Sequence, residues 1–296
     1  MSIDKEGQID IQSEIPSKDY EKILGQIDVI ISDQEGVSDK KMEEFVKSRT
    51  ETLTEKSKTT HLSAAGGEHS FYDGFIRPDA NIRSSFLVDP FRLDDNSIYP
   101  MLLETMKELK NGSGKGKEIR RLTSTAIMIT LARYFGNAYT LQNTEARNRE
   151  IYSEKTESDD KFISIKEFKD KGVAVCVEKA TMAQNLLQFV GLDSFIIFSS
   201  KCRSAEEEKE DLHAYNIISS DNGYSIFDPT NPSLQIDELS KFPVSYYPAM
   251  YRISKEQFNE IKNGGTVEVT HRNFSILEDG ATKIDESKRI YGGPSK

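Results

Sequence analysis

The sequence predicts an α+β protein in which a long helix is followed by an antiparallel sheet. Residues 173–190 form an apolar segment that ends at Gly191, and glycine is common just beyond the last residue of a helix. Three runs with strand character follow, at 194–200, 213–219 and 224–228. The last two runs flank Asp221-Asn222-Gly223, which is typical of a tight hairpin turn. A helix followed by a meander of this kind indicates an α+β layout.

The first sixty residues are polar, but helical spacing is visible within them. Apolar residues recur at intervals of three and four over residues 18–32, and residues 38–56 carry a thinner apolar stripe. Because so few residues there are apolar, we expect residues 1–60 to be a polar helical or partly disordered leader. A leader of this kind would be dispensable for the folding of the rest of the chain.

The next stretch is expected to be irregular at first and then helical. Gly, Pro, Asp and Ser recur at short intervals over residues 57–97, whereas residues 98–110 have helical character. Residues 61–114 are therefore predicted to be an irregular and helical connection. The segment NGSGKGK at 111–117 lacks the spacing of a phosphate-binding loop, so no nucleotide site is expected there. Residues 118–136 then form an apolar helix that is expected to be buried.

We place the predicted core at residues 115–262, from this apolar helix to the end of the meander. Residues 236–262 add a short helix and a Tyr-rich connection. Residues 263–296 are expected to form a small β-rich C-terminal element, because residues 266–277 read as two short strands around a turn.

Composition argues against several classes of function and partner. The chain of 296 residues has a formal net charge of -10, and an acidic surface repels nucleic acid. It has two cysteines, too few for a disulfide framework. No segment resembles a signal peptide or a membrane span. We therefore expect a soluble, cytoplasmic protein, although non-classical secretion stays open, as does the oligomeric state. We expect no nucleic-acid or membrane partner.

Cys176 stands at the start of the predicted helix 173–190. Backbone N–H groups at a helix start have no helical partner, and the helix dipole is positive there. Both effects favour a thiolate, and the same N–H groups can bind a developing oxyanion. The alternative is that Cys176 is a small apolar core residue, since free cysteines are often buried.

His213 and Asp228 are placed at the remote ends of the predicted hairpin. His213 begins one strand, and Asp228 ends the next, so pairing around the turn brings them side by side. We expect His213 to act as general base and acid, and its imidazole to point toward the helix packed on the sheet. Asp228 would orient the imidazole and stabilise its charged form. The alternatives are a structural histidine and a turn aspartate before a proline.

These three segments resemble the transglutaminase-like superfamily of papain-like cysteine enzymes. The resemblance rests on GVAVCVEKATMAQNLLQFVGL, HAYNIIS and GYSIFDPT in this order, and it covers about residues 162–232. It implies that Cys176, His213 and Asp228 are a catalytic triad. It also implies a transglutaminase-like core in which the catalytic cysteine lies at a helix N-terminus packed on an antiparallel sheet.

The resemblance leaves the second oxyanion donor open. Some members of the family use a tryptophan upstream of the cysteine, and this chain has no tryptophan. Tyr139, Gln142 and Asn143 lie upstream of Cys176, and each carries a side chain that can donate a hydrogen bond. These three residues are therefore the candidates for the oxyanion donor.

The resemblance implies a thiol-dependent hydrolase or acyltransferase that acts on amide bonds of protein or peptide substrates. Water as acceptor would give a protease or deamidase, and an amine would give a transglutaminase. The alternative is a non-catalytic protein-interaction module on the same fold. No cofactor or metal is expected, because the remaining histidines lack ligand-like spacing with the cysteines. Cys202 is expected to be incidental, and residues 203–212 to form an exposed acidic loop beside the site.

Overall fold

We analysed a computed structural model of the chain. It describes residues 18–32, 38–57, 62–64, 67–69, 75–76, 87–89, 97–112, 119–136, 151, 162–192, 194–205, 208–220, 223–230, 235–236, 243–246, 250–276 and 281–293.

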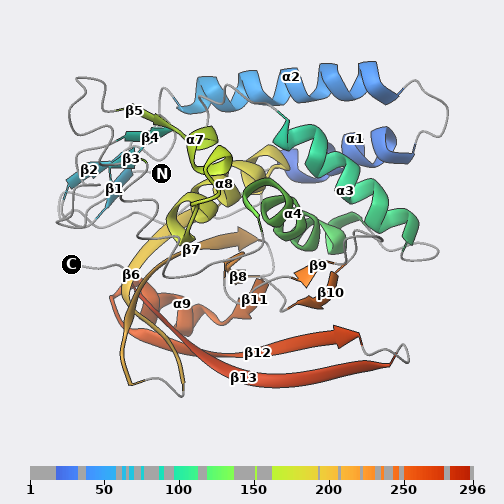
Figure 1. Cartoon of the computed structure of the whole chain (residues 1–296). Helices are drawn as coiled ribbons and strands as arrows, with labels where there is room; N and C mark the ends of the chain where they lie inside the picture. Colours follow the sequence, from blue (N-terminus) through green and yellow to red (C-terminus); the bar gives the residue numbers. More distant parts are fainter. Residues whose placement is uncertain are drawn as a thin grey trace.

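Most of the described helices gather on one side of the molecule, above the main sheet in Figure 1. They are α1 (Lys18–Ser32), α2 (Ser38–Ser57), α3 (Ile98–Gly112), α4 (Ile119–Phe135), α7 (Ile165–Asp170) and α8 (Cys176–Phe189). The helical spacing in the sequence therefore predicted α1 to α4 and α8 correctly, with small differences at the ends.

An eight-stranded sheet forms the other side, in the order β11-β8-β7-β6-β13-β12-β10-β9. All its described pairings are antiparallel. Its strands are β6 (Ser194–Ser204), β7 (Asp211–Ser220), β8 (Gly223–Phe227), β9 (Gln235–Ile236), β10 (Pro243–Tyr246), β11 (Met250–Ile253), β12 (Thr266–Ile276) and β13 (Thr282–Gly292). α9 (Lys255–Lys262) contacts both β8 and β12, so the six strands from β11 to β12 curve around this helix and are nearly closed. The predicted mixture of helix and antiparallel sheet is confirmed.

Two small sheets lie apart from the main one. β1 (Leu62–Ala64) pairs with β2 (Gly67–His69), and β3 (Phe75–Ile76), β4 (Leu87–Asp89) and β5 (Phe162–Ser164) form the other sheet. β4 and β5 run parallel. The expectation of irregular chain over 57–97 missed β1 to β4, because two or three residues are too few to show alternation.

The two faces of β7 pack against different cores. Ala214 and Ile218 belong to the core that includes α8. Tyr215 and Ile217 belong to a second core, which α9 and the ends of β12 and β13 share. Because successive side chains of a strand point to opposite faces, β7 separates the helical layer from the interior of the curved sheet.

The N-terminal helices are part of the first core. Its members include Tyr20, Ile23, Leu24, Ile27 and Ile31 from α1, and Val46 and Leu53 from α2. The Arg49 side chain of α2 donates hydrogen bonds to Phe189 O at 2.9 Å and Gln188 O at 2.7 Å, which lie at the end of α8. At Gly191, just beyond α8, a Cβ would lie 2.8 Å from Ile23 Cδ1 and 3.0 Å from Tyr20 Cα. The described part of residues 1–60 therefore packs on the core, and we no longer expect it to be dispensable.

Truncation of Ile27 tests whether α1 contributes to the stability of the core. Ile27 is fully buried and Val29, on the same helix, is 63% exposed. We expect Ile27→Ala to lower the free energy of unfolding by about 2–5 kcal/mol, since it removes buried methyl groups and leaves a cavity. Val29→Ala is the matched control and should change it by about 0.5 kcal/mol or less. Urea unfolding followed by circular dichroism measures both, and equal small effects would restore the independent leader.

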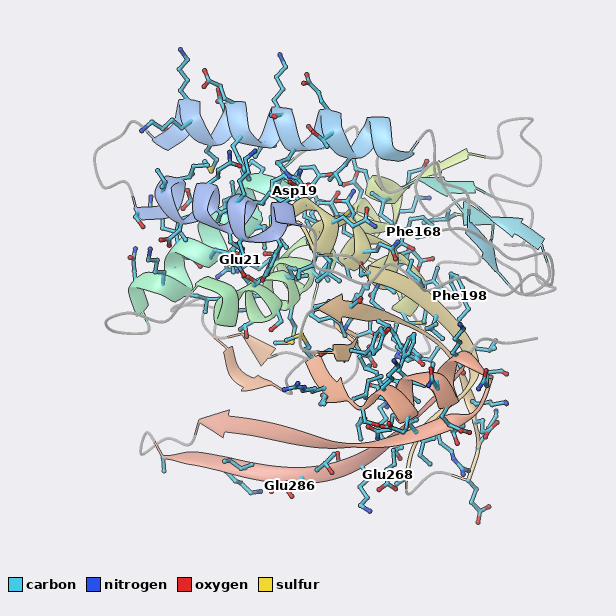
Figure 2. All side chains as sticks on the ribbon, turned by 180° about the vertical axis from the view of Figure 1, so that it is seen from behind. Asp19, Glu21, Phe168, Phe198, Glu268 and Glu286 are labelled. Atoms are coloured by element: carbon cyan, nitrogen blue, oxygen red, sulfur yellow. The ribbon has the colours of Figure 1, made fainter. Side chains whose placement is uncertain are left out.

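The C-terminal stretch is a long ribbon within the main sheet. β12 and β13 pair along their whole length, from Thr266 opposite Gly292 to Ile276 opposite Thr282. The prediction of two short strands within 266–277 is wrong, because that stretch is almost entirely one strand. Figure 2 shows Glu268 and Glu286 on this ribbon, away from the helical layer. The expectation of β structure in this region is confirmed, but the ribbon joins β6 and β10 and is no separate element.

Within the part of the chain that the structure describes, no helix is both long and apolar enough to cross a membrane.

Candidate functional site

The start of α8 is positioned by a short turn after α7. Val173 N donates to Phe168 O at 3.0 Å, which closes the end of α7. The backbone is then extended at Val175, and Val175 N donates to Glu178 Oε2 at 3.0 Å. This bond joins the residue before the helix to its first turn. It places Cys176, 7% exposed, at the N-terminal end of α8, as the sequence predicted.

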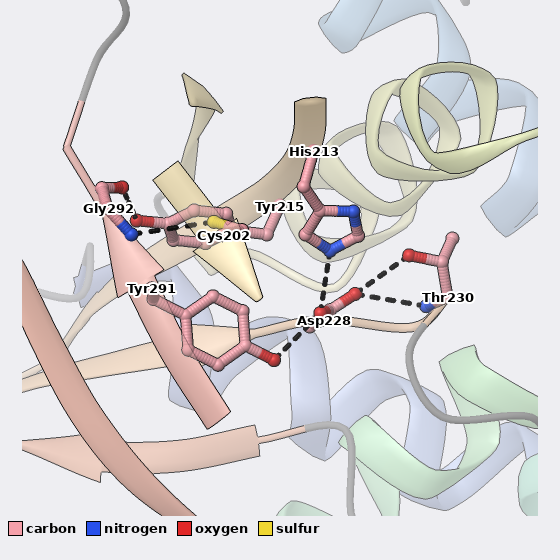
Figure 3. Close-up of polar contacts among 7 residues, drawn as sticks. All are labelled: Cys202, His213, Tyr215, Asp228, Thr230, Tyr291 and Gly292. Atoms are coloured by element: carbon pink, nitrogen blue, oxygen red, sulfur yellow. Dashed lines mark hydrogen bonds and ion pairs between the residues drawn. The ribbon is translucent and has the colours of Figure 1, made fainter. Parts of the chain in front are cut away.

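His213 and Asp228 form a buried pair, as the hairpin predicted. The register of β7 and β8 runs from Ser220 opposite Gly223 to Asn216 opposite Phe227, so Asp228 emerges beside the first half of β7. His213 Nε2 lies 2.8 Å from Asp228 Oδ2 (Figure 3). His213 is 8% exposed and Asp228 1%, so little solvent separates or screens them.

Both pKa values in this pair shift in the direction of an ion pair. Burial acts to lower the pKa of His213, but the charge and hydrogen bond of Asp228 outweigh it and raise that pKa well above its ordinary value. Burial acts to raise the pKa of Asp228, but His213 outweighs it and lowers that pKa strongly. Together they favour an imidazolium beside a carboxylate.

Cys176 also takes part in this group. After Asp228, Cys176 also acts to raise the pKa of His213, so the thiol lies close enough to the imidazole to influence its charge. The structure therefore brings Cys176, His213 and Asp228 together, while their catalytic roles stay predictions.

The route by which His213 reaches Cys176 differs from the expectation. The His213 imidazole was expected to lie on the face of its strand that the helix covers, but Tyr215 and Ile217, which alternate onto the same face as His213, pack in the core on the other side of β7. Asn216 is the residue that faces α8, and its Nδ2 donates to Ala180 O at 3.0 Å. His213 meets α8 at its first residue, beyond the face that packs on the sheet.

Two further residues hold Asp228, and the sequence did not reveal them as site residues. Thr230 donates to Asp228 Oδ1 through its hydroxyl at 2.8 Å and its backbone N–H at 3.2 Å. Tyr291 OH donates to Asp228 Oδ2 at 2.7 Å. The nearby Asp228-Pro229-Thr230 turn could have indicated Thr230. No local pattern links Tyr291 to a residue so far away in the chain.

Cys202 is buried close to the same group. Gly292 N lies 3.4 Å from Cys202 Sγ, and Tyr215 OH donates to Gly292 O at 2.6 Å. Burial raises the pKa of Cys202, and the charge of His213 acts to lower it. Cys202 is fully buried and contacts backbone, which agrees with a packing role.

Several expected features are only partly described. The oxyanion candidates Tyr139, Gln142 and Asn143 lie outside the described residues. The acidic loop is shorter than 203–212, because β6 extends to Ser204 and β7 begins at Asp211. Residues 208–210 between them are exposed, as expected. Among the residues that the structure places, no three His, Cys, Asp or Glu side chains could hold a metal ion together.

Comparison with known proteins adds no relative to this picture. Searches against protein-family models, curated proteins and solved structures gave no significant match to this chain. The functional argument therefore rests on the residues and their geometry.

Proposed function

We propose that this chain is a thiol-dependent hydrolase or acyltransferase that acts on amide bonds of protein or peptide substrates. The proposal includes a papain-like core of the transglutaminase-like kind. The observation that carries it is a buried imidazole that binds a carboxylate through Nε2 at 2.8 Å and lies close enough to Cys176, at a helix N-terminus, for Cys176 to raise its pKa.

The proposed reaction follows from these positions. Cys176 gives its proton to His213, and the sulfur attacks the carbonyl carbon of the amide. The oxyanion that forms is stabilised by backbone N–H groups at the start of α8. His213 returns the proton to the leaving amine as the C–N bond breaks, which leaves a thioester on Cys176. Water or a second amine, deprotonated by His213, then attacks the thioester and releases the thiol. Asp228 orients the imidazole throughout.

Alkylation of the two cysteines tests the proposal without a known substrate. We expect iodoacetamide to modify Cys176 at pH 7 faster than a free thiol, because the thiolate is the reactive form. Cys202 is the internal control, since its burial and raised pKa should protect it until the protein unfolds. Peptide mass spectrometry gives both rates.

A His213→Asn variant serves as the second control. It should slow alkylation of Cys176 at pH 7 by about tenfold or more, because the thiol loses the base that takes its proton. If Cys176 reacts at pH 7 no faster than a free thiol, or if His213→Asn leaves its rate unchanged, the chain is better described as a non-catalytic interaction module.

The acyl acceptor is identified by a second experiment. The protein is incubated with a cell lysate, with and without an added primary amine, and the products are analysed by mass spectrometry. New peptide termini indicate a protease, conversion of glutamine to glutamate indicates a deamidase, and incorporation of the amine indicates a transglutaminase.

A further inference from the structure

The C-terminal strand β13 reaches the candidate site through one side chain. Tyr291 is fully buried in the core of the curved sheet. Its hydroxyl donates to Asp228 Oδ2 at 2.7 Å, and His213 Nε2 lies 2.8 Å from the same oxygen. Figure 3 shows the tyrosine and the imidazole approaching Asp228 from different sides. Two donors therefore share one carboxylate oxygen.

The close approach of β13 to β6 places Tyr291 there. β13 pairs with β6 through Ile290 opposite Arg203. At Gly292 a side chain would not fit, since a Cβ there would lie 2.5 Å from Lys201 Cβ and 2.6 Å from Ser199 Oγ. Gly292 also accepts a hydrogen bond from Tyr215 OH at 2.6 Å. The pairing with Arg203 and the close packing of Gly292 on Lys201 and Ser199 hold the end of β13 beside Asp228.

We propose that Tyr291 is a positioning residue of the site, whose hydroxyl holds the Asp228 carboxylate and limits the negative charge that it presents to His213. This inference rests on the proposed function. A hydrogen bond from a neutral donor draws electron density from the shared oxygen, so the carboxylate stabilises the imidazolium less than it would alone. Thr230 holds Oδ1, which leaves Tyr291 as the group that competes with His213 for Oδ2.

The direction of the effect follows from this competition. Without the Tyr291 hydroxyl, Oδ2 carries more charge toward His213, so the imidazolium becomes more stable and its pKa rises. The same loss also raises the pKa of Asp228, which the Tyr291 hydrogen bond acts to lower. The cluster of His213, Asp228 and Tyr291 also interacts electrostatically with other titratable or charged side chains. These are Cys176 from α8, Cys202 from β6, Tyr215 from β7, Tyr251 from β11 and Arg289 from β13. All of them remain unchanged in a Tyr291→Phe variant.

The test is a titration of His213 by NMR in protein labelled with ¹⁵N-histidine. The chain has four histidines, and the His213 signals are assigned as those lost in His213→Asn. We expect Tyr291→Phe to raise the pKa of His213 by about half a pH unit or more. The upper limb of the pH profile for Cys176 alkylation should move in the same direction.

Tyr215→Phe is the matched control. It removes a hydroxyl from a second buried tyrosine in the same core, but that hydroxyl donates to Gly292 O instead of the carboxylate. Both variants should lose stability, whereas only Tyr291→Phe should move the His213 titration. If both variants move it equally, or neither does, Tyr291 has a merely structural role and the inference is wrong.

Failure of the proposed function gives a different result. In that case Cys176 of the unmodified protein reacts with iodoacetamide at pH 7 no faster than a free thiol, before any substitution, whereas the His213 titration can still respond to Tyr291→Phe. If Tyr291→Phe does not fold, the test uses protein with 3-fluorotyrosine at position 291 instead. Fluorination makes the phenol a stronger hydrogen-bond donor at almost the same volume. The pKa of His213 should then fall, and an unchanged value would overturn the inference.

Discussion

Cys176→Ser is expected to abolish turnover on any amide substrate identified for this protein, by about 10⁴-fold or more. A serine hydroxyl is a far weaker acid than a thiol, and a site that activates a thiol is not arranged to deprotonate it. His213→Ala should be nearly as damaging, because it removes both the base for Cys176 and the acid for the leaving group. Initial rates on a substrate from the lysate experiment measure both losses.

Cys202→Ser is the matched control for this prediction. Cys202 accepts a hydrogen bond from Gly292 N, and a serine oxygen can accept the same bond. The control should therefore keep turnover within about threefold of the unmodified protein, since no step of the proposed reaction uses Cys202. Full activity in Cys176→Ser would remove the nucleophile from the proposal, and loss of activity in Cys202→Ser alone would point to the other thiol.

The sequence revealed those parts of the site that depend on local pattern. Cys176 was placed by the start of an apolar helix, and His213 and Asp228 by a hairpin whose turn is visible in the sequence. The hairpin register then required the pair to meet. A strand and a helix start are short-range features, so their placement needs no knowledge of the whole fold.

The parts that the sequence missed depend on packing between distant segments. Tyr291 joins Asp228 across a separation of 63 residues, and Arg49 joins Phe189 across 140. Neither residue stands in a motif, and each is placed by the way whole elements pack. The same reasoning explains the revised role of α1, because the apolar spacing of residues 18–32 does not indicate which element they pack against.

The sequence also did not reveal which face of β7 the helix covers. Alternation correctly separated His213 and Tyr215 from Asn216, but it does not state which face a helix covers. The helix covers the face of Ala214, Asn216 and Ile218. Ala214 and Ile218 pack in the core that includes α8, and Asn216 donates a hydrogen bond to Ala180 O of that helix. His213 reaches Cys176 only because it lies near the start of β7, beside the N-terminal end of α8.

Asp228→Asn is expected to make the stability of the protein less dependent on pH between pH 6 and pH 10. The raised pKa of His213 means that its contribution to stability is complete below its ordinary value of 6.5 and is lost as the pH rises through the folded-state value. The lowered pKa of Asp228 means that its contribution is present above its ordinary value of 3.8 and is lost as the pH falls through the folded-state value. Both contributions are therefore complete between about pH 4 and pH 6.5.

The substitution should cost the most free energy of unfolding inside that window. At pH 6 we expect a loss of about 2–4 kcal/mol, less than for a fully broken buried pair, because asparagine can still hydrogen bond to His213. The loss should shrink as the pH rises through the folded-state pKa of His213, because the imidazole of the unmodified protein is neutral above it and an isolated buried carboxylate no longer stabilises the fold. Urea unfolding at pH 6, 8 and 10 measures this loss of free energy.

Glu268→Gln, which breaks the exposed pair with Lys288, is the control and should give a small effect at pH 6 and pH 8. A loss for Asp228→Asn at pH 6 that is no larger than the loss for Glu268→Gln would show that the buried ion pair does not stabilise the folded protein, and the ion pair would then have no part in the proposed mechanism.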